Sequence, residues 1–260
     1  MSETVITSRD NPVFRRLRKL AESARARREA GMTLLDGEHL LAAYLDAGGA
    51  PRTLVRAASS EAGRLSTFAV RCPQAKCVTF ADALFAELSP VATPSGLLAE
   101  AAWLAPEPTQ AATPFVVVLE DIQDPGNLGA MLRTAAAAGA TQAVLSKGCH
   151  DPWSPKALRG GQGAQFVLPM RTGEDLVAWL QGFAGARIAL ALGQACDFYS
   201  LDLRGALALV AGNEGAGLSA AVCGAATRCA QIPMPGRVES LNASAALAVA
   251  VFEAVRQRRG

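Results

Sequence analysis

The feature that most limits the fold is a series of short, uninterrupted apolar runs in the second half of the chain. They occupy residues 115–119, 143–145, 166–168, 188–192, 207–211 and 230–232. Strands of a parallel sheet are covered on both faces and are therefore apolar throughout. Segments with helical periodicity lie between most of the runs, at residues 128–138, 176–183, 218–223 and 241–256. The pattern predicts an α/β fold with a doubly wound, mostly parallel sheet, which binds ligands at the carboxyl ends of its strands.

The first hundred residues predict a separate, smaller α/β domain. Short β-like runs at residues 33–35, 53–55, 77–80 and 97–103 alternate with helical segments at residues 40–47 and 82–88. Residues 106–114 contain three prolines and no periodicity, which is typical of an extended linker. We therefore expect a domain at residues 1–105, a linker at residues 106–114 and a second domain at residues 115–260.

A concentrated basic segment begins the chain. Eight basic residues and two acidic residues lie between Arg9 and Arg28, although the whole chain has a net charge of only +2. Asn11 can cap a helix that starts with Pro12, and apolar residues at helical spacing extend this helix to Gly31. The basic face is either a solvated surface or a contact for a nucleic-acid backbone.

Several classes of protein are disfavoured by the sequence. No window approaches the roughly 20 uninterrupted apolar residues that a membrane span needs. The amino terminus lacks the basic and apolar regions of a signal peptide, so we expect a cytoplasmic protein without membrane contact. The six cysteines contain no C-x-x-C pair and the two histidines are far apart, so we expect no metal site and no disulfide framework.

Three loops that are dense in Gly, Asn, Pro and Ser follow predicted strands, at residues 120–129, 212–219 and 232–244. In the first loop Asn127 can be a helix cap, with Arg133 six residues later in the helix. The second loop has three glycines in six residues, which permit close approach of the backbone to a ligand, although a plain turn is an equal alternative. Its spacing is not the dinucleotide fingerprint. In the third loop Ser240 can cap the last helix.

Together, and in this order, the loops resemble the three motifs of the SpoU/TrmH class in the SPOUT superfamily of S-adenosylmethionine-dependent RNA methyltransferases. The resemblance is carried by N-L-G-A-M-L-R-T-A-A-A-A-G-A from Asn127, G-N-E-G-A-G-L-S from Gly212 and I-P-M-P-G-R-V-E-S-L-N-A-S from Ile232. It covers about residues 115–257. The first domain is similar to the substrate-binding domain that often precedes this catalytic domain, through I-T-S from Ile6, Asn11-Pro12 and L-D-G-E-H-L-L from Leu35.

The resemblance implies a carboxy-terminal trefoil knot, a homodimer formed through the catalytic domain and a bent S-adenosylmethionine as cofactor. Knots are too rare to be predicted from apolar patterning. The family's cofactor-binding positions correspond to Leu209, Gly212, Ile232, Met234, Ser240, Leu241 and Asn242. Ser244 is expected to help hold the third loop.

The implied reaction transfers a methyl group to a ribose 2′-hydroxyl of RNA. The family's proposed catalytic residue corresponds to Arg133. Asn127 and Glu214 are expected to order the site or to contact the RNA and the other subunit. A guanidinium has a pKa above about 12, so whether Arg133 removes the proton or clamps the phosphate stays open. The basic residues expected to contact RNA are Arg9, Arg15, Arg16, Arg18, Lys19 and Arg159.

The form of the first domain favours ribosomal RNA as the substrate, with transfer RNA as the alternative. A non-catalytic RNA-binding protein on the same scaffold is a second alternative, and an enzyme acting on a small molecule or protein is a third. The 14 aromatic residues show no clustering for base stacking, which favours recognition of RNA shape and phosphates. Gly160-Gly161 stands where relatives commonly have Ala-Ser, which puts the contact by Arg159 in doubt.

Overall fold

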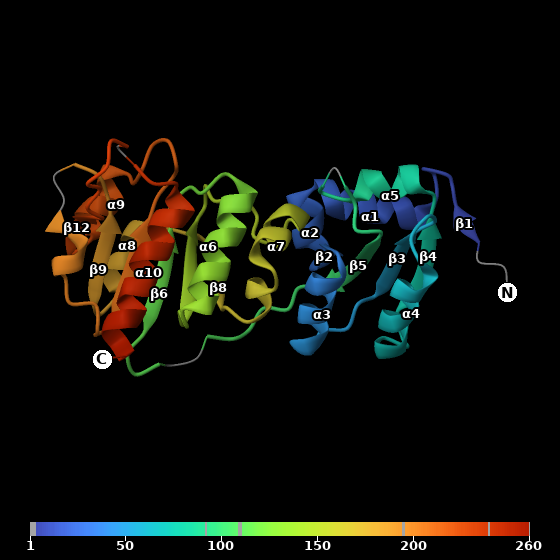
Figure 1. The fold of residues 1–260 in the computed structure, drawn as a ribbon, viewed down its shortest axis with the longest axis horizontal. Helices are drawn as coiled ribbons and strands as arrows, with labels where there is room; N and C mark the ends of the chain where they lie inside the picture. The colour runs from blue at the N-terminus through green and yellow to red at the C-terminus, as the bar shows by residue number, and fades with distance from the viewer. Residues whose placement is uncertain (1–3, 92, 109–110, 194–195, 239, 260) are drawn as a thin grey trace. The chain divides into compact units, whose positions relative to one another are not determined.

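The computed structural model describes the chain except for residues 1–3, 92, 109–110, 194–195, 239 and 260. The described residues form two compact units (Figure 1). The first unit contains Met1–Leu104 and Asp151–Phe166, and the second contains Ala105–His150 and Val167–Gly260. Among the described helices, none combines the length and the apolar character that crossing a bilayer requires.

The sheet of the first unit has five strands among the described residues, in the order β1-β4-β3-β5-β2. These are β1 (Val5–Ile6), β2 (Met32–Asp36), β3 (Thr53–Ala57), β4 (Lys76–Phe80) and β5 (Leu97–Ala102). Strands β1, β4 and β3 are parallel, whereas β5 runs antiparallel to both β3 and β2. The predicted small α/β domain is therefore present, with a mixed sheet.

The helices of the first unit cover this sheet. They are α1 (Pro12–Glu22), α2 (Ala24–Ala30), α3 (Glu38–Asp46), α4 (Ala62–Arg71), α5 (Asp82–Leu88) and α7 (Pro155–Gly161). The single helix predicted up to Gly31 is divided at Ser23. The backbone of Ser23 is extended and its hydroxyl accepts a hydrogen bond from the amide of Ala26, so Ser23 ends α1 and caps α2. Asn11 caps α1, as predicted.

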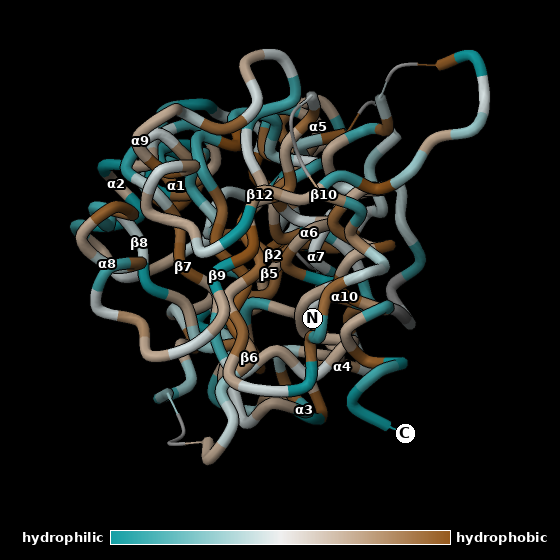
Figure 2. The backbone as a smooth tube through the Cα atoms, turned by 90° about the vertical axis from the view of Figure 1, so that its left-hand side faces the viewer, coloured by the Kyte–Doolittle hydropathy of each residue, from teal (hydrophilic) through white to brown (hydrophobic). Residues whose placement is uncertain are grey.

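The sheet of the second unit is entirely parallel, with seven strands among the described residues in the order β10-β12-β9-β11-β6-β7-β8. These are β6 (Phe115–Leu119), β7 (Gln142–Ser146), β8 (Met170–Glu174), β9 (Ala186–Leu190), β10 (Cys196–Asp197), β11 (Leu207–Ala211) and β12 (Arg228–Gln231). The predicted α/β architecture is confirmed. Figure 2 shows hydrophobic residues along β6 and β7 and a hydrophilic end of α10.

The helices of the second unit pack in pairs. They are α6 (Pro125–Ala137), α8 (Leu176–Gly182), α9 (Ala220–Ala225) and α10 (Ala243–Arg259). Helices α8 and α9 pack together over one face of the sheet, where Val116, Val118 and Val210 are buried. Helix α10 packs against α6 and contacts β11. Because alternate residues of a strand face opposite sides, both faces of β6 and β11 are available for burial, as their apolar sequences indicate.

The strand predicted at residues 166–168 is wrong. Ala164–Phe166 forms a 3₁₀ turn, and the strand that pairs with β7 is β8, at Met170–Glu174. Strand β8 lies at the edge of the sheet, and three of its five residues are exposed, so its sequence has no continuous apolar run. Along the chain, the division between the two units falls inside the apolar run at residues 166–168, after Phe166.

Residues 151–166 pack within the first unit, although they follow the first strands of the second unit in sequence. The rings of Trp103 and Trp153 stack with centroids 5.3 Å apart, and Phe166 packs edge-on against Tyr44. The hydroxyl of Thr33 donates a 2.6 Å hydrogen bond to the carbonyl of Trp153. The described chain therefore passes between the units three times. The division into residues 1–105 and 115–260 places this segment in the second domain and stays a prediction.

A buried ion pair fixes the start of this segment. Arg27 donates from Nε to the carboxylate of Asp151 at 2.7 Å, and the two side chains are only 4% and 9% exposed. A second guanidinium nitrogen of Arg27 donates to the carbonyls of Leu20 and Ala21, near the end of α1. The pair therefore joins α1, α2 and the segment that follows His150.

We expect Arg27→Ala to lower the free energy of unfolding by about 3 to 5 kcal/mol, because it leaves the carboxylate of Asp151 buried without its cation. The matched control is Arg25→Ala, which removes an exposed ion pair with Glu29 on the same helix and should cost about 0.3 to 0.5 kcal/mol. Urea unfolding of the full chain measures both. Equal effects of the two substitutions would contradict the importance of the buried pair.

Candidate functional site

The three polar loops meet at the side chain of Asn127. Asn127 was predicted to cap α6, but the cap is Asp124, whose carboxylate accepts a 2.8 Å hydrogen bond from the amide of Asn127. The side chain of Asn127 is therefore free to bridge the loops. Its Nδ2 donates to Glu214 at 2.6 Å, and its Oδ1 accepts from Asn242 at 3.4 Å. One side-chain amide thus connects the first loop to Glu214, 87 residues later in the sequence, and to Asn242, 115 residues later.

The second loop, at residues 212–219, has a backbone that requires glycine. A Cβ on Gly212 would lie 2.4 Å from the carbonyl oxygen of Gly217, so no side chain fits there without moving the backbone. Gly217 has a φ of +68°, which L-residues rarely adopt. Asn213 and Gly217 exchange two backbone hydrogen bonds that close the loop. The glycines therefore allow a closed turn over residues 214–216, which agrees with the plain-turn alternative as well as with a ligand-binding loop.

The third loop ends in a different helix cap from the one predicted. Asn242, rather than Ser240, accepts hydrogen bonds at its Oδ1 from the amides of Ser244 and Ala245, at 2.9 and 3.3 Å. The hydroxyl of Ser244 also donates to this oxygen at 2.6 Å. Asn242 therefore caps α10 with its oxygen while its nitrogen faces Asn127, and Ser240 is left exposed beside a cavity. Glu239, in the same loop, lies outside the described residues.

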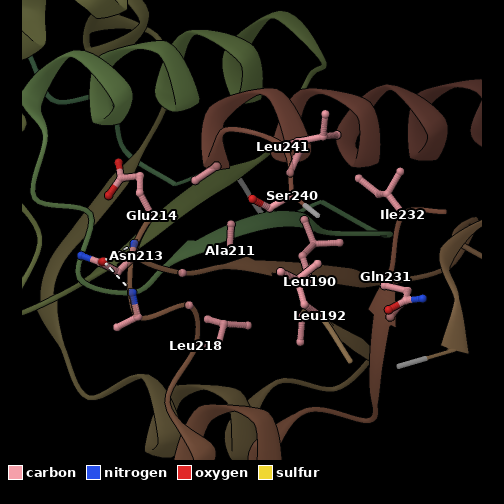
Figure 3. Close-up of a pocket in the computed structure, with 18 of the residues that line it drawn as sticks. Leu190, Leu192, Ala211, Asn213, Glu214, Leu218, Gln231, Ile232, Ser240 and Leu241 are labelled. Carbon is pink, nitrogen blue, oxygen red and sulfur yellow. Dashed lines mark hydrogen bonds between the residues drawn. The ribbon is translucent and has the colours of Figure 1, made fainter. Parts of the chain in front are cut away.

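A cavity of about 500 Å³ lies at the carboxyl ends of β9, β11 and β12 (Figure 3). Its volume falls in the range of roughly 300 to 1,000 Å³ that is usual for small-molecule and cofactor sites. Glu214 and Asn213 lie at one end of the cavity, and Ile232 and Gln231 lie at the other. The cavity therefore has a polar end beside Asn127, and at the opposite end one polar side chain, Gln231, lies next to the apolar Ile232.

The cavity contains most of the predicted cofactor-binding residues. Gly212, Ile232, Met234, Ser240 and Leu241 line it. Two other predicted residues are not among the described lining residues: Leu209 is fully buried inside β11, and Asn242 caps α10.

The apolar wall of the cavity includes residues that the sequence analysis missed. Leu190 is the last residue of β9, Leu192 lies two residues beyond it, and Leu218 belongs to the second loop. Because ligands bind at the carboxyl ends of parallel strands, the end of the run at residues 188–192 was a signal for the first two.

The chemistry of the lining suits a ligand that has both an apolar part and polar groups. Leucine, isoleucine and methionine side chains supply dispersion contacts, and the glycine-rich loop exposes backbone amides and carbonyls. Among the described lining residues, Glu214 is the one with a formal charge. Burial raises the pKa of the neighbouring Cys223 thiol, so Cys223 acts as a neutral wall residue. The described residues contain no cluster of side chains suited to a metal ion.

Arg133 lies in the middle of α6 and is exposed. No hydrogen bond or ion pair links it to another residue in the described part of the chain. It does not line the cavity, and it follows Asn127 by six residues, so the two side chains leave the helix in different directions. Arg133 is thus an exposed cation without an ion-pair partner among the described residues, and it lies on the same helix as Asn127.

The basic residues predicted to contact RNA divide into two groups. Arg16 forms a two-pronged ion pair with Glu100, at 2.8 and 2.9 Å, and Glu100 is completely buried. Arg159 donates to the buried carboxylate of Asp36 at 3.2 Å. These two arginines neutralise buried carboxylates.

The remaining predicted cations lie on the surface. Arg9 pairs with Glu87, and Arg18 pairs with Glu22 one helical turn away. Arg15 and Lys19 are exposed on α1 and have no ion pair with any residue that the structure describes.

Comparison with known proteins agrees with this geometry. The profile of the SpoU rRNA methylase family matches residues 114–252, and the profile of the MRM3-like substrate-binding domain matches residues 11–99. The chain belongs to the SpoU rRNA methylase family. The resemblance predicted from the three motifs is therefore confirmed.

The relatives and structural neighbours of the chain are RNA methyltransferases. It is 33% identical to an uncharacterized tRNA/rRNA methyltransferase of Synechocystis, over 97% of this chain and 94% of the relative. It is 30% identical to the 23S rRNA (guanosine(2553)-2′-O)-methyltransferase RlmP of Bacillus subtilis, over 90% and 92%. The crystal structure of an AdoMet-bound rRNA methyltransferase from Sinorhizobium meliloti matches with a TM-score of 0.81 and 27% identity, over 97% of both chains.

We expect Arg16→Ala to destabilise the protein by about 1 to 3 kcal/mol at neutral pH, because a buried carboxylate loses its partner. Burial acts to raise the pKa of Glu100, but hydrogen bonds from Arg16 and Thr53 hold it below the ordinary value of 4.5. The stabilisation that Glu100 contributes in the wild type is therefore complete above pH 4.5 and is lost as the pH falls below it.

In Arg16→Ala, burial is no longer offset by the arginine, so protonation of Glu100 relieves the destabilisation. The difference in unfolding free energy between wild type and variant should shrink as the pH falls. Urea unfolding at neutral and acidic pH measures this difference, and Arg15→Ala on the same helix is the control. A difference that does not change with pH would contradict the role of Glu100.

Proposed function

We propose that this protein is an S-adenosylmethionine-dependent methyltransferase that modifies a ribose 2′-hydroxyl of ribosomal RNA. The observation that carries the proposal is the meeting of the three motif loops at Asn127, beside a cavity of cofactor size, in a chain of the SpoU family. Relatives named as 23S rRNA 2′-O-methyltransferases support both the reaction and the class of RNA.

In this proposal the cavity holds S-adenosylmethionine, whose sulfonium supplies the methyl group. Leu190, Ile232, Met234 and Leu241 provide apolar surface for the flat base. The backbone of the second loop and the hydroxyl of Ser240 are available as hydrogen-bonding groups for the polar parts of the cofactor. Glu214 places a carboxylate at the polar end of the cavity, where a cationic group of the ligand is favoured.

Arg133 is proposed to act on the RNA. A ribose hydroxyl is a weak nucleophile, so the enzyme must position it for in-line attack and assist removal of its proton. A guanidinium keeps its proton at ordinary pH and offers five donors in a planar fork, which suits a phosphate together with the hydroxyl. Asn127 and Glu214 are proposed to fix the positions of the first and second loops relative to each other through their hydrogen bond. Ser244 is proposed to hold the side chain of Asn242 in place.

The first unit is proposed to bind the RNA, in line with its match to a substrate-binding domain. Arg15 and Lys19, one turn apart on α1, are the strongest candidates for phosphate contacts because both are exposed and unpaired in the described structure. Arg9 and Arg18 are surface residues that can exchange a carboxylate partner for a phosphate. Arg16 and Arg159 are proposed to support the unit instead, since each neutralises a buried carboxylate.

Three further properties belong to the same proposal. A homodimer formed through the second unit is supported by Val249 and Phe252, which expose apolar surface on one face of α10. A trefoil knot in the carboxy-terminal segment is supported by membership of the SpoU family. A cytoplasmic location belongs to the same proposal and is supported by the bacterial rRNA methyltransferases among the relatives.

Substitution of Arg133 tests its proposed role. We expect Arg133→Ala to lower methyl transfer about 100-fold or more, because assisted proton removal and positioning each contribute factors of this order. Binding of S-adenosylmethionine should be unchanged, since Arg133 does not line the cavity. Single-turnover transfer and isothermal titration calorimetry measure the two quantities. If Arg133→Lys retains transfer within a few fold of wild type, the fork-shaped side chain is not required.

The reaction itself is tested by supplying labelled S-adenosylmethionine and total RNA from cells that lack this gene. We expect label in ribosomal RNA that depends on Arg133 and survives alkaline hydrolysis as a dinucleotide, because a methylated 2′-oxygen cannot attack the adjacent phosphate. Label confined to transfer RNA would assign the alternative substrate. Cofactor binding without label in either RNA, free or within ribosomal particles, would contradict the proposed activity.

A further inference from the structure

Two consecutive residues, Glu120 and Asp121, follow β6 and contact both ends of the second loop. The amide of Glu120 donates to the carbonyl of Ala211 at 2.9 Å, which continues the pairing of β6 with β11 past the end of the strands. The second loop starts at the next residue, Gly212. Neither Glu120 nor Asp121 lines the cavity in the described structure, and the proposed reaction gives them no role.

Glu120 holds the far end of the loop. Its Oε1 accepts a 2.6 Å hydrogen bond from the hydroxyl of Ser219, and its Oε2 accepts a 2.8 Å hydrogen bond from the amide of the same residue. Hydrogen bonds to an ionised carboxylate are stronger than those between neutral groups. Ser219 also caps α9 and directly follows Leu218, which lines the cavity. The carboxylate therefore fixes the point where the cavity wall joins α9.

Asp121 holds the near end of the loop through its backbone. Its carbonyl accepts a 2.9 Å hydrogen bond from Nδ2 of Asn213, whose own Oδ1 accepts from the amides of Gly215 and Ala216 at 2.8 and 3.1 Å. Asp121 has a φ of +52°, which is uncommon for a residue other than glycine.

Ser146 stabilises this unusual conformation. Its hydroxyl accepts from the amide of Asp121 at 2.9 Å and donates to the carboxylate of the same residue at 2.6 Å. The direction of the Asp121 carbonyl is thus set by a neighbouring strand, β7, rather than by the loop it serves.

We infer that Glu120 and Asp121 form a clamp that positions the second loop before any ligand binds. The loop contains three glycines, each of which adds conformational freedom, so fixing both ends removes much of that freedom in advance. Glu214 lies between the two clamped ends and is held 2.6 Å from Asn127. Glu120 and Asp121 are therefore positioning residues. The inference deepens the proposed function, since it assigns the residues that prearrange the cofactor site.

The first measurement needs no cofactor. Hydrogen–deuterium exchange of the full chain reports the protection of the amides in residues 212–219, several of which are bonded to Asn213 or Glu120. We expect Glu120→Ala to raise exchange in this segment at least tenfold and to leave β6 and β11 protected. The matched control is Asp202→Ala, which removes an exposed carboxylate that also binds a backbone amide in the second unit.

The second measurement is the dissociation constant for S-adenosylmethionine. We expect Glu120→Ala to raise it about tenfold or more, whereas Asp202→Ala leaves it unchanged. Glu120→Gln keeps one acceptor oxygen and should give a smaller increase in the dissociation constant.

A double-mutant cycle with Glu214→Ala separates positioning from general destabilisation. If Glu120 acts by placing Glu214, the loss of kcat/KM caused by Glu120→Ala should be smaller in the Glu214→Ala background than in the wild type.

The outcomes distinguish this inference from the proposed function. Unchanged exchange in residues 212–219 of Glu120→Ala would overturn the clamp, even if the wild type methylates RNA. Faster exchange in a protein that neither binds S-adenosylmethionine nor methylates RNA would support the clamp and overturn the function. If Glu120→Ala does not fold, Glu120→Gln, which keeps one acceptor oxygen for residue 219 and leaves the cap of α9 in place, gives the same comparison.

Discussion

The side-chain amide of Asn127 is the interaction on which the arrangement of the second unit's site depends. An amide has a donor end and an acceptor end, and here the donor binds Glu214 while the acceptor binds Asn242. The arrangement works because Asp124, and not Asn127, takes the cap position of α6. The parallel sheet brings the three loops to one edge, and this amide then fixes their mutual spacing.

Much of the second unit could be predicted from the sequence because its strands are buried on both faces. The runs that became β6 and β11 have the apolar character that this burial demands, and every residue of both strands is buried. Strand β8 lacks that character because it lies at an exposed edge, so it was missed and a neighbouring apolar run was taken for a strand. Leu190 and Leu192 end a predicted apolar run, so their place at the carboxyl edge of the sheet could be predicted, but their place beside the second and third loops depends on strand order, which short-range periodicity does not contain.

The site was predictable in residue identity but less so in residue geometry. The motifs located Asn127, Gly212, Glu214 and Asn242, yet the choice of cap at α6 and α10 depended on competition among neighbouring polar residues. The basic helix shows a similar limit. Arg15 and Arg16 are adjacent in sequence, but one faces outward and the other neutralises Glu100, which lies 84 residues away. From the local sequence both arginines are expected to be surface charges, and only the long-range packing against Glu100 shows that Arg16 is not.

The insertion of residues 151–166 into the first unit has a consequence for how the protein is made. Chains fold progressively as they leave the ribosome, and an amino-terminal domain usually completes its core first. Here several residues of the first unit contact partners that are synthesised only after β6 and β7 of the other unit. These residues are Arg27, Thr33, Tyr44 and Trp103. The two units therefore cannot mature strictly one after the other during translation, and grafting either onto a new partner would have to preserve this shared stretch of chain.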